Sequence, residues 1–331
     1  MTKNLKNVYF MKKPISIGGP SSFQIRFENK LRENGYKIIY ANSKICKKNS
    51  VIFIIGGTKK IFWLLKNKIY GTKIILRLDG INDYSYHFKD GFLNFVKSRI
   101  INIIVNFIRC RLANHIVYQS LYVRKVWKTF GATKSGSSVI YNAVDLNEFY
   151  PTNKDSKLLN AKIVVVEGTV QGPLAVNALN AISFYKVDIY GSLQKEIKKK
   201  INEVRLKNLN FHGPVPRHMI PKVLIGKKIY LCLEINPACP NSVIEALASG
   251  VPVVGFDSGS LSELVGNAGI ILKYTGGNAD KMESPNCNKL NYAINKINKN
   301  YKKYSMLARA RAKKLFSSNN QYEKYIQILK S

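Results

Sequence analysis

The chain has 331 residues, of which 46% are apolar, and a formal net charge of +34 at pH 7. This length predicts about two domains, and the apolar content is sufficient for a buried core in each. No stretch reaches the roughly 18 uninterrupted apolar residues that a membrane-spanning helix needs. The stretch from Met1 to Lys13 has basic residues but lacks the apolar core of a signal peptide. We therefore expect a cytoplasmic protein, either soluble or peripheral at a membrane.

The cysteines indicate neither a disulfide framework nor a zinc site. Cys46, Cys110, Cys232, Cys239 and Cys287 are scattered, and no two of them form a C-x-x-C pair. The four histidines are equally dispersed. We expect no bound metal, and the simplest role for Cys239 is to fill space in a core.

The positive charge is spread along the chain, and its dense run at Lys198–Lys200 is typical of a solvated face. No zinc-finger spacing, RNA-binding aromatic run or basic zipper accompanies it, so we expect no specific nucleic acid partner. An anionic membrane surface is the partner that such a charge favours more.

Short apolar runs alternate with helical patterns in the first half of the chain. Phe23, Phe27 and Leu31 lie at four-residue spacing, which predicts a helix from Phe23 to Asn34 that Gly35 ends. Strands are expected at residues 8–10, 37–40, 51–55, 73–78, 115–119 and 139–141. Continuous apolar strands separated by helices predict a parallel sheet that is covered on both faces.

Residues 92–113 mix apolar side chains with Lys97, Arg99, Arg109 and Arg111. One interpretation is an interfacial helix that rests on anionic lipid. The other is an ordinary helix whose apolar side faces the core and whose basic residues point outward.

The polar stretch at residues 152–160 has no periodicity and is typical of a linker. After it, strands are expected at residues 162–166, 187–190, 209–211, 228–233 and 252–256, and basic helices at 301–330. Two such series predict an α/β protein with two Rossmann-like, doubly wound domains facing a central cleft. We place these domains at residues 1–151 and 161–310, with residues 311–331 as a helix that packs back towards the first domain.

The most informative stretch runs from Pro237 to Val254. Asn241 is expected to cap a helix that begins at Ser242, with Glu245 in its first turn. Free N–H groups at such a helix start can receive a diphosphate, and Glu245 could then accept a hydrogen bond from a ribose or sugar hydroxyl. The strand that follows places the site at the carboxyl edge of a parallel sheet. A capped helix before a strand also occurs in purely structural units, so the pattern alone does not decide the function.

The same stretch resembles the donor-site signature of retaining glycosyltransferases of family 4, which have the GT-B fold. Four more segments resemble the family in the expected order. They are the glycine loop Gly18-Gly19-Pro20, the segment Val139–Phe149 that closes the first domain, the turn Phe211–Gly213 before the nucleotide base pocket, and the loop Gly259–Val265 with Glu263.

The chain departs from the family's paired glutamates. Members usually have two glutamates eight positions apart, whereas Pro237 stands eight positions before Glu245. Glu234 lies three residues earlier still. We expect a variant loop, Pro237–Asn241, whose backbone groups hold the sugar.

Two further departures concern charge. The loop at residues 167–173 has no basic residue, where members offer an Arg and a Lys to the diphosphate, so amides at Gly168 and Thr169 are expected to contribute more. Asp79 follows the fourth strand, where many members have a His. Asp79 is expected either to bind a sugar hydroxyl or act as a base, or to be a turn residue.

The resemblance implies a hexosyltransferase-like enzyme that moves a sugar from a nucleoside-diphosphate sugar to a glycan or lipid-linked acceptor. It also implies retention of configuration, and the absence of an Asp-x-Asp motif favours a metal-independent reaction without other cofactors. The expected catalytic residues are Glu245 and Asp79. The expected donor-binding residues are Gly18, Gly19, Gly168, Thr169, Gly213, Pro240, Asn241, Ser242 and Glu245.

The departures leave open a second hypothesis, a nucleotide-sugar-binding protein of the same fold with impaired catalysis. A dinucleotide-dependent oxidoreductase or epimerase is disfavoured, because no G-x-G-x-x-G follows the first strand.

Overall fold

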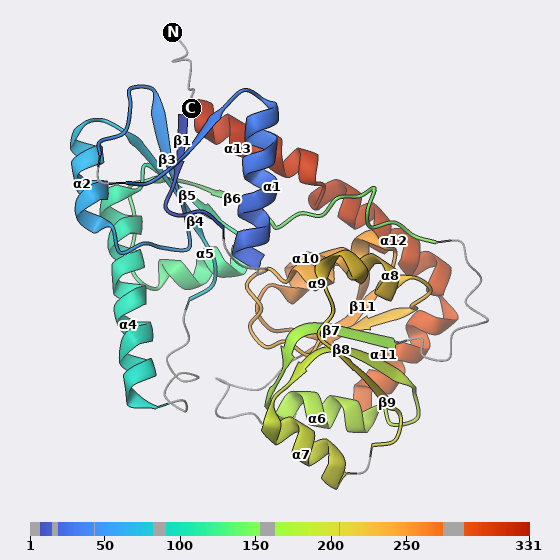
Figure 1. Ribbon diagram of the computed structural model, residues 1–331. Coiled ribbons are helices and arrows are strands. Elements are labelled where there is room, and N and C mark those ends of the chain that lie inside the picture. The colour runs from blue at the N-terminus through green and yellow to red at the C-terminus, as the bar shows by residue number, and fades with distance from the viewer. Residues whose placement is uncertain are drawn as a thin grey trace. The chain divides into compact units, whose positions relative to one another are not determined.

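A computed structural model describes residues 7–14, 19–42, 44–81, 91–152, 163–204, 206–273 and 288–331. Its contacts divide the chain into two units, Met1–Asn142 with Asn319–Ser331 and Ala143–Ser318. Each unit has a six-stranded parallel sheet with helices packed against it (Figure 1). The α/β class with two Rossmann-like halves is confirmed. Gly18 and all of the expected linker except Thr152 lie outside the described residues.

The sheet of the first unit has the strand order β2-β1-β3-β4-β5-β6. Its strands are β1 (Asn7–Phe10), β2 (Lys37–Tyr40), β3 (Ser50–Ile55), β4 (Lys73–Leu78), β5 (His115–Tyr118) and β6 (Gly136–Val139). Its helices are α1 (Gly19–Glu33), α2 (Ile61–Ile69), α4 (Phe92–Phe107), the π-helix η1 (Ile108–Leu112), α5 (Leu121–Lys128) and α13 (Ser318–Lys330).

Helices α1 and α13 cover one face of this sheet. Phe23 and Phe27 of α1 and Tyr325 of α13 pack against Phe53 of β3, with ring centroids 5.0–6.4 Å apart. The alternate residues of β3, Ile52 and Ile54, are also fully buried, which shows that the sheet is covered on its other face too. This burial on both faces explains why the strands of the sheet are continuously apolar.

The sheet of the second unit has the order β12-β11-β10-β7-β8-β9. Its strands are β7 (Ile163–Val170), β8 (Val187–Leu193), β9 (Leu209–Gly213), β10 (Ile229–Leu231), β11 (Val253–Phe256) and β12 (Gly269–Leu272). Its helices are α6 (Gly172–Ala181), α7 (Lys195–Glu203), the 3-10 turn η3 (Arg217–Met219), α8 (Ile220–Leu224), α9 (Asn241–Ala248), α10 (Leu261–Val265), α11 (Asn288–Lys299) and α12 (Tyr301–Leu315).

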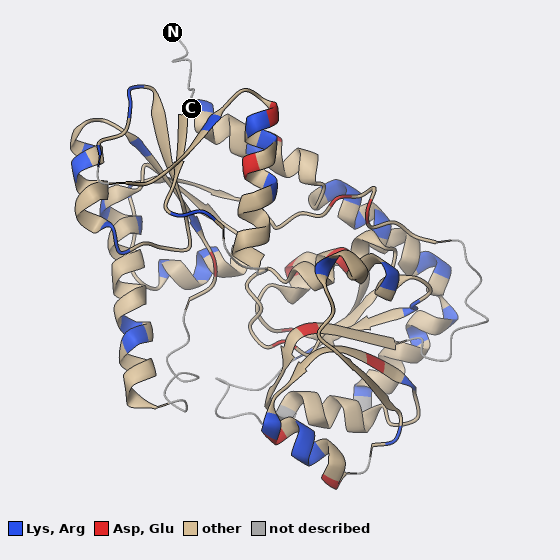
Figure 2. Ribbon diagram, viewed as in Figure 1, with Lys and Arg blue, Asp and Glu red and all other residues tan. Residues whose placement is uncertain are grey.

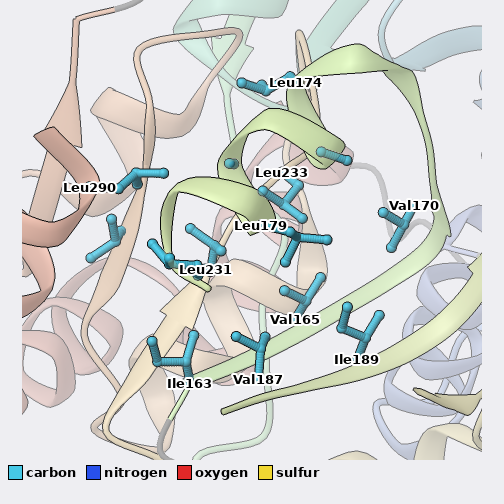
Figure 3. Packing of buried hydrophobic residues seen from close by; sticks show 14 of the residues in the cluster. Ile163, Val165, Val170, Leu174, Leu179, Val187, Ile189, Leu231, Leu233 and Leu290 are labelled. Atoms are coloured by element: carbon cyan, nitrogen blue, oxygen red, sulfur yellow. The ribbon is translucent and has the colours of Figure 1, made fainter. Parts of the chain in front are cut away.

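The core of this unit lies between the sheet and helices α6, α7 and α11. In Figure 3, Val165 of β7 and Leu231 of β10 pack with Leu179 of α6 and Leu290 of α11, and all four are fully buried. Burial of such side chains removes apolar surface from water and stabilises the unit by roughly 1.5–3 kcal/mol for each.

Three expectations about elements were wrong. The last strand of the first unit is Gly136–Val139 rather than 139–141, because β6 is an edge strand whose Gly and Ser residues need no apolar cover. Strand β12 was missed altogether. Residues 167–170 are not a loop, because β7 continues through a bulge between Val166 and Thr169 while it pairs with β8.

Candidate functional site

The candidate donor site lies at the carboxyl edge of the second sheet. From β7 the chain proceeds to β8 and β9 on one side, and β10 to β12 lie on the other, so the order reverses between β7 and β10. Doubly wound sheets bind ligands outside the strand ends at such a switch point. Helix α9 follows β10 and therefore begins at this edge.

The start of α9 differs in detail from the expectation. The helix begins at Asn241, so Pro240 and not Asn241 is the N-cap, and the cap makes no side-chain hydrogen bond. A proline cap has no side-chain oxygen to accept from the first-turn N–H groups. These donors, on Asn241, Ser242 and Val243, therefore face the edge without a side-chain acceptor from the cap, as an anion-binding helix start requires.

The hydroxyl of Ser242 has a structural partner. Tyr230 in β10 is fully buried, and its Oη donates to the carbonyl oxygen of Val166 at 2.8 Å. The Ser242 hydroxyl hydrogen-bonds to the same Oη. This contact ties the start of α9 to strands β7 and β10, so Ser242 offers a ligand its backbone N–H rather than its side chain.

Glu245 is buried one residue beyond the first turn, which corrects the expectation that it lies within that turn. Its Oε1 accepts a hydrogen bond from Arg217 Nη2 at 2.7 Å, and the side chains are 6% and 29% exposed. The charge that balances this buried carboxylate is therefore Arg217 rather than the helix dipole. Arg217 belongs to η3, which follows the turn at Gly213, so the loop after β9 reaches α9.

The loop between β10 and α9 is held by the segment after β11. Ser258 Oγ accepts from the N–H of Asn236 at 2.7 Å, and the N–H of Ser260 donates to Pro237 O at 2.8 Å. A Cβ on Gly259 would lie 2.4 Å from the nitrogen of Pro237, and its φ is +61°, so only glycine fits there. Gly259 thus fixes the backbone that leads to Pro240.

Glu167, Gly168 and Thr169 form the bulged end of β7. A Cβ on Gly191 of β8 would lie 1.9 Å from the carbonyl oxygen of Glu167, so the bulge depends on that glycine. Glu167 Oε1 accepts from the N–H of Leu233 at 2.7 Å, which joins the ends of β7 and β10. Gly168 and Thr169 are exposed residues, as a donor-binding role requires.

Glu167 and Glu234 bring two carboxyl groups to the same edge. Burial, and then the nearby Glu234, raise the pKa of Glu167 from 4.5 to about 8. Burial also raises the pKa of Glu234. Glu234 is an exposed residue, although protein surrounds most of its carboxyl group. At neutral pH Glu167 is thus mainly protonated, which reduces the repulsion that a bound diphosphate would meet.

Asp79 lies in the other unit, at the carboxyl end of β4. Its Oδ1 accepts from Arg77 Nη1 at 3.0 Å, and its side chain is 31% exposed. Burial raises the pKa of Asp79, and Arg77 acts in the opposite direction. A cavity of about 370 Å³ opens beside it, lined among others by Thr58, Lys59, Asn102 and Trp127.

Of Gly18 and Gly19, which were expected to bind the donor, the structure describes only Gly19. Gly19 is the first residue of α1 and is exposed. Gly18 lies outside the described residues, so its role stays a prediction. Within the parts of the chain that the structure describes, no three His, Cys, Asp or Glu side chains gather as metal ligands.

Sequence reasoning missed two arginines that hold the expected carboxylates. Arg77 lies two residues from Asp79 and reads as one more strand residue. Arg217 lies 28 residues before Glu245, and no local pattern connects them. Glu167 was noticed only as a loop residue.

Solved structures resemble the whole chain. Sucrose-phosphate synthase from Thermosynechococcus elongatus aligns with a TM-score of 0.75 and 13% identity over 98% of each chain. HepE from Anabaena, solved with UDP and glucose, aligns at 0.71 and 15% identity over 98% of this chain and 99% of its own. WaaG, a glycosyltransferase involved in lipopolysaccharide biosynthesis, aligns at 0.67 and 11% identity over 98% and 99%.

The fold is therefore that of the GT-B glycosyltransferases. Residues 174–314, which contain α9, Glu245 and Arg217, match the family described as Glycosyl transferases group 1. This match covers less than half of the chain. No curated protein matches the chain in sequence.

Proposed function

We propose that the chain is a retaining, metal-independent glycosyltransferase that moves a sugar from a nucleoside-diphosphate sugar to a glycan or lipid-linked acceptor. The observation that carries this proposal is the start of α9. It combines first-turn N–H groups that receive no side-chain hydrogen bond from the Pro240 cap with a buried Glu245 at the switch point, inside the matched residues 174–314. HepE was solved with UDP and with UDP-glucose, which makes UDP-sugars the first donors to test.

In this proposal the diphosphate binds at the N–H groups of Asn241, Ser242 and Val243, and at the backbone of Gly168 and Thr169. These amides are fixed before the donor arrives, so they stabilise the charge that develops on the leaving phosphate without reorganising. Glu245, oriented by Arg217, accepts from a ribose or sugar hydroxyl. Front-face attack by the acceptor hydroxyl needs no protein nucleophile and no metal.

The acceptor is proposed to bind the cavity beside Asp79. The cavity combines the polar groups of Thr58, Lys59 and Asp79 with the apolar wall of Val105 and Trp127. A Cβ on Gly57 would lie 2.6 Å from Val105 Cγ2, so α4 forms this wall at close range. A hydroxyl-bearing acceptor with apolar parts suits such a lining. The role of WaaG in lipopolysaccharide biosynthesis is consistent with an acceptor of this kind.

We also propose that helix α4 rests on an anionic membrane surface. Its buried residues are Ser98, Asn102 and Val105, two of them polar. Within α4 the apolar side is therefore not the buried side, although Ile108 and Leu112 of the following η1 are buried as expected of a core-facing helix. An apolar stripe at three- and four-residue spacing is exposed instead, by 73% at Leu93 and 60% at Ile103. The stripe consists of Leu93, Val96, Ile100, Ile103 and Phe107.

The charge of α4 favours an anionic membrane, rather than a second copy of the chain, as the partner of its exposed stripe. The only charged residues of α4 are Lys97 and Arg99, one on each side of the stripe, and Figure 2 shows no acidic residue on this helix. A symmetric pair of α4 helices would bring like charges together. An anionic bilayer satisfies both the apolar stripe and the flanking cations. No helix within the described ranges has the length and apolar character to cross a bilayer.

The enzyme proposal is tested by release of nucleoside diphosphate from a panel of nucleotide sugars, with and without acceptor extracts. Glu245→Ala should reduce turnover of the preferred donor roughly 10–100-fold, because it removes a hydrogen bond to a charged group. Glu203→Gln is the control, since Glu203 is an exposed carboxylate of α7 in the same unit. Equal turnover in Glu245→Ala and wild type would overturn the role of Glu245.

The second candidate is a nucleotide-sugar-binding protein of the same fold without efficient catalysis. The observation that favours it is the lack of Lys and Arg from residue 167 to residue 173. It predicts a donor-induced rise in Tm without turnover. Release of nucleoside diphosphate by the wild type eliminates this candidate.

A further inference from the structure

Arg77 is a nearly fully buried guanidinium with three assigned partners. Nη1 donates to Asp79 Oδ1 at 3.0 Å, Nη2 to Asn142 Oδ1 at 2.7 Å, and Nε to Tyr325 Oη at 3.1 Å. Its side chain is only 2% exposed. Asp79 is the one anion among these partners, so the two neutral groups fix the direction of the guanidinium and the carboxylate balances its charge.

Rigid packing surrounds this guanidinium. Its carbon Cζ lies 3.9 Å from the ring centroid of Phe23 of α1. Tyr325 of α13 is 1% exposed, and its ring lies 5.4 Å from that of Phe23 and 5.6 Å from that of Phe53. The hydroxyl that holds Arg77 Nε is therefore itself held by the aromatic core of the unit, although it lies 248 positions along the chain from Arg77.

We propose that Arg77 is a positioning residue that orients the Asp79 carboxylate at the cavity, and that Tyr325 of α13 fixes Arg77 for this task. The catalytic part of the inference rests on the proposed function, since it takes Asp79 as the group that meets the acceptor. In this arrangement helix α13 helps to position the Asp79 carboxylate at the acceptor site.

The electrostatics of Asp79 make this coupling measurable. Burial raises the pKa of Asp79, and the charge and hydrogen bond of Arg77 lower it. Among the described residues that line the cavity with Asp79, Lys59 is the only other titratable side chain, and Asn102 of α4 and Trp127 of α5 are neutral. Weaker contact between Arg77 and Asp79 therefore leaves burial unopposed, and the pKa of Asp79 rises further.

The experiment compares two tyrosines of the same helix. Tyr325→Phe removes the hydroxyl that holds Arg77. Tyr322→Phe is the matched control, because Tyr322 Oη is buried without a hydrogen-bond partner in the described part of the chain. Carboxyl NMR titration of isotope-labelled protein should show a higher pKa for Asp79 in Tyr325→Phe than in wild type, and no change in Tyr322→Phe. An unchanged pKa of Asp79 in a folded Tyr325→Phe variant would overturn the inference.

Activity separates this inference from the proposed function. In the wild type, kcat/KM should fall as the pH drops through the pKa of Asp79, and in Tyr325→Phe this acid limb should move to higher pH. Arg77→Lys should restore part of the activity lost in Arg77→Met. If Asp79→Asn is as active as wild type while the NMR shift is present, the coupling stands and the proposed role of Asp79 fails.

Discussion

At the scale of single residues, the charge of Glu245 is balanced by Arg217, from a different part of the second unit. Removing the carboxylate leaves the guanidinium, 29% exposed, without its counter-ion. Glu245→Ala should therefore lower the free energy of unfolding by about 1–3 kcal/mol, less than for a fully buried pair.

The double variant Arg217→Ala/Glu245→Ala checks this account of the pair. It should be less destabilised than the sum of the two single variants, which urea denaturation would measure. Strictly additive losses would contradict the pairing.

Glu167 predicts a dependence of stability on pH. Its pKa rises from 4.5 to about 8 on folding, so the folded chain keeps the proton when the unfolded chain loses it. Its contribution to stability is thus fully present below about pH 4.5 and is lost as the pH rises to about 8. Glu167→Gln keeps the oxygen that accepts from Leu233, and should gain stability relative to wild type across this window in urea denaturation. A difference that is the same at both ends of the window would contradict the raised pKa.

At the scale of elements, composition predicted a helix over residues 92–113, of which α4 covers Phe92–Phe107, but not which of its sides would be buried. Ser98 and Asn102 are buried and the isoleucine-rich stripe is exposed, and only tertiary packing decides such an orientation. The edge strand β6 was misplaced for a related reason. A strand with a neighbour on only one side tolerates Gly and Ser, so β6 lacks the continuous apolar run of β3 or β4. Strand β12 does have a short apolar run, Ile270–Leu272, which was overlooked.

The exposed stripe of α4 gives the prediction at this scale. Ile100→Asp/Ile103→Asp should abolish sedimentation with vesicles of phosphatidylcholine and phosphatidylglycerol, while leaving Tm nearly unchanged because both side chains are exposed. Phe184→Asp is the control, since Phe184 is a 92% exposed apolar residue of the second unit. Binding should weaken with salt and with loss of phosphatidylglycerol. Equal sedimentation of the α4 variant and wild type would rule out this surface.

At the scale of the whole molecule, the alternation of apolar strands and helices sufficed to predict two Rossmann-like halves. The local part of the candidate site, from Pro240 to Glu245, could also be predicted. A helix that begins soon after a buried strand produces a pattern in consecutive residues. The partners Arg217, Tyr325 and Gly191 could not be predicted, since each meets its site only through sheet order and helix packing.

The proposed function requires the donor's diphosphate to bind at the start of α9. Titration of labelled protein with the nucleoside diphosphate that raises Tm most, UDP being tested first, reads this directly from amide chemical shifts. The N–H resonances of Asn241, Ser242 and Val243 should shift in a saturable manner, together with those of Gly168 and Thr169. Saturating nucleotide that leaves the first-turn amides of α9 unperturbed would contradict the account.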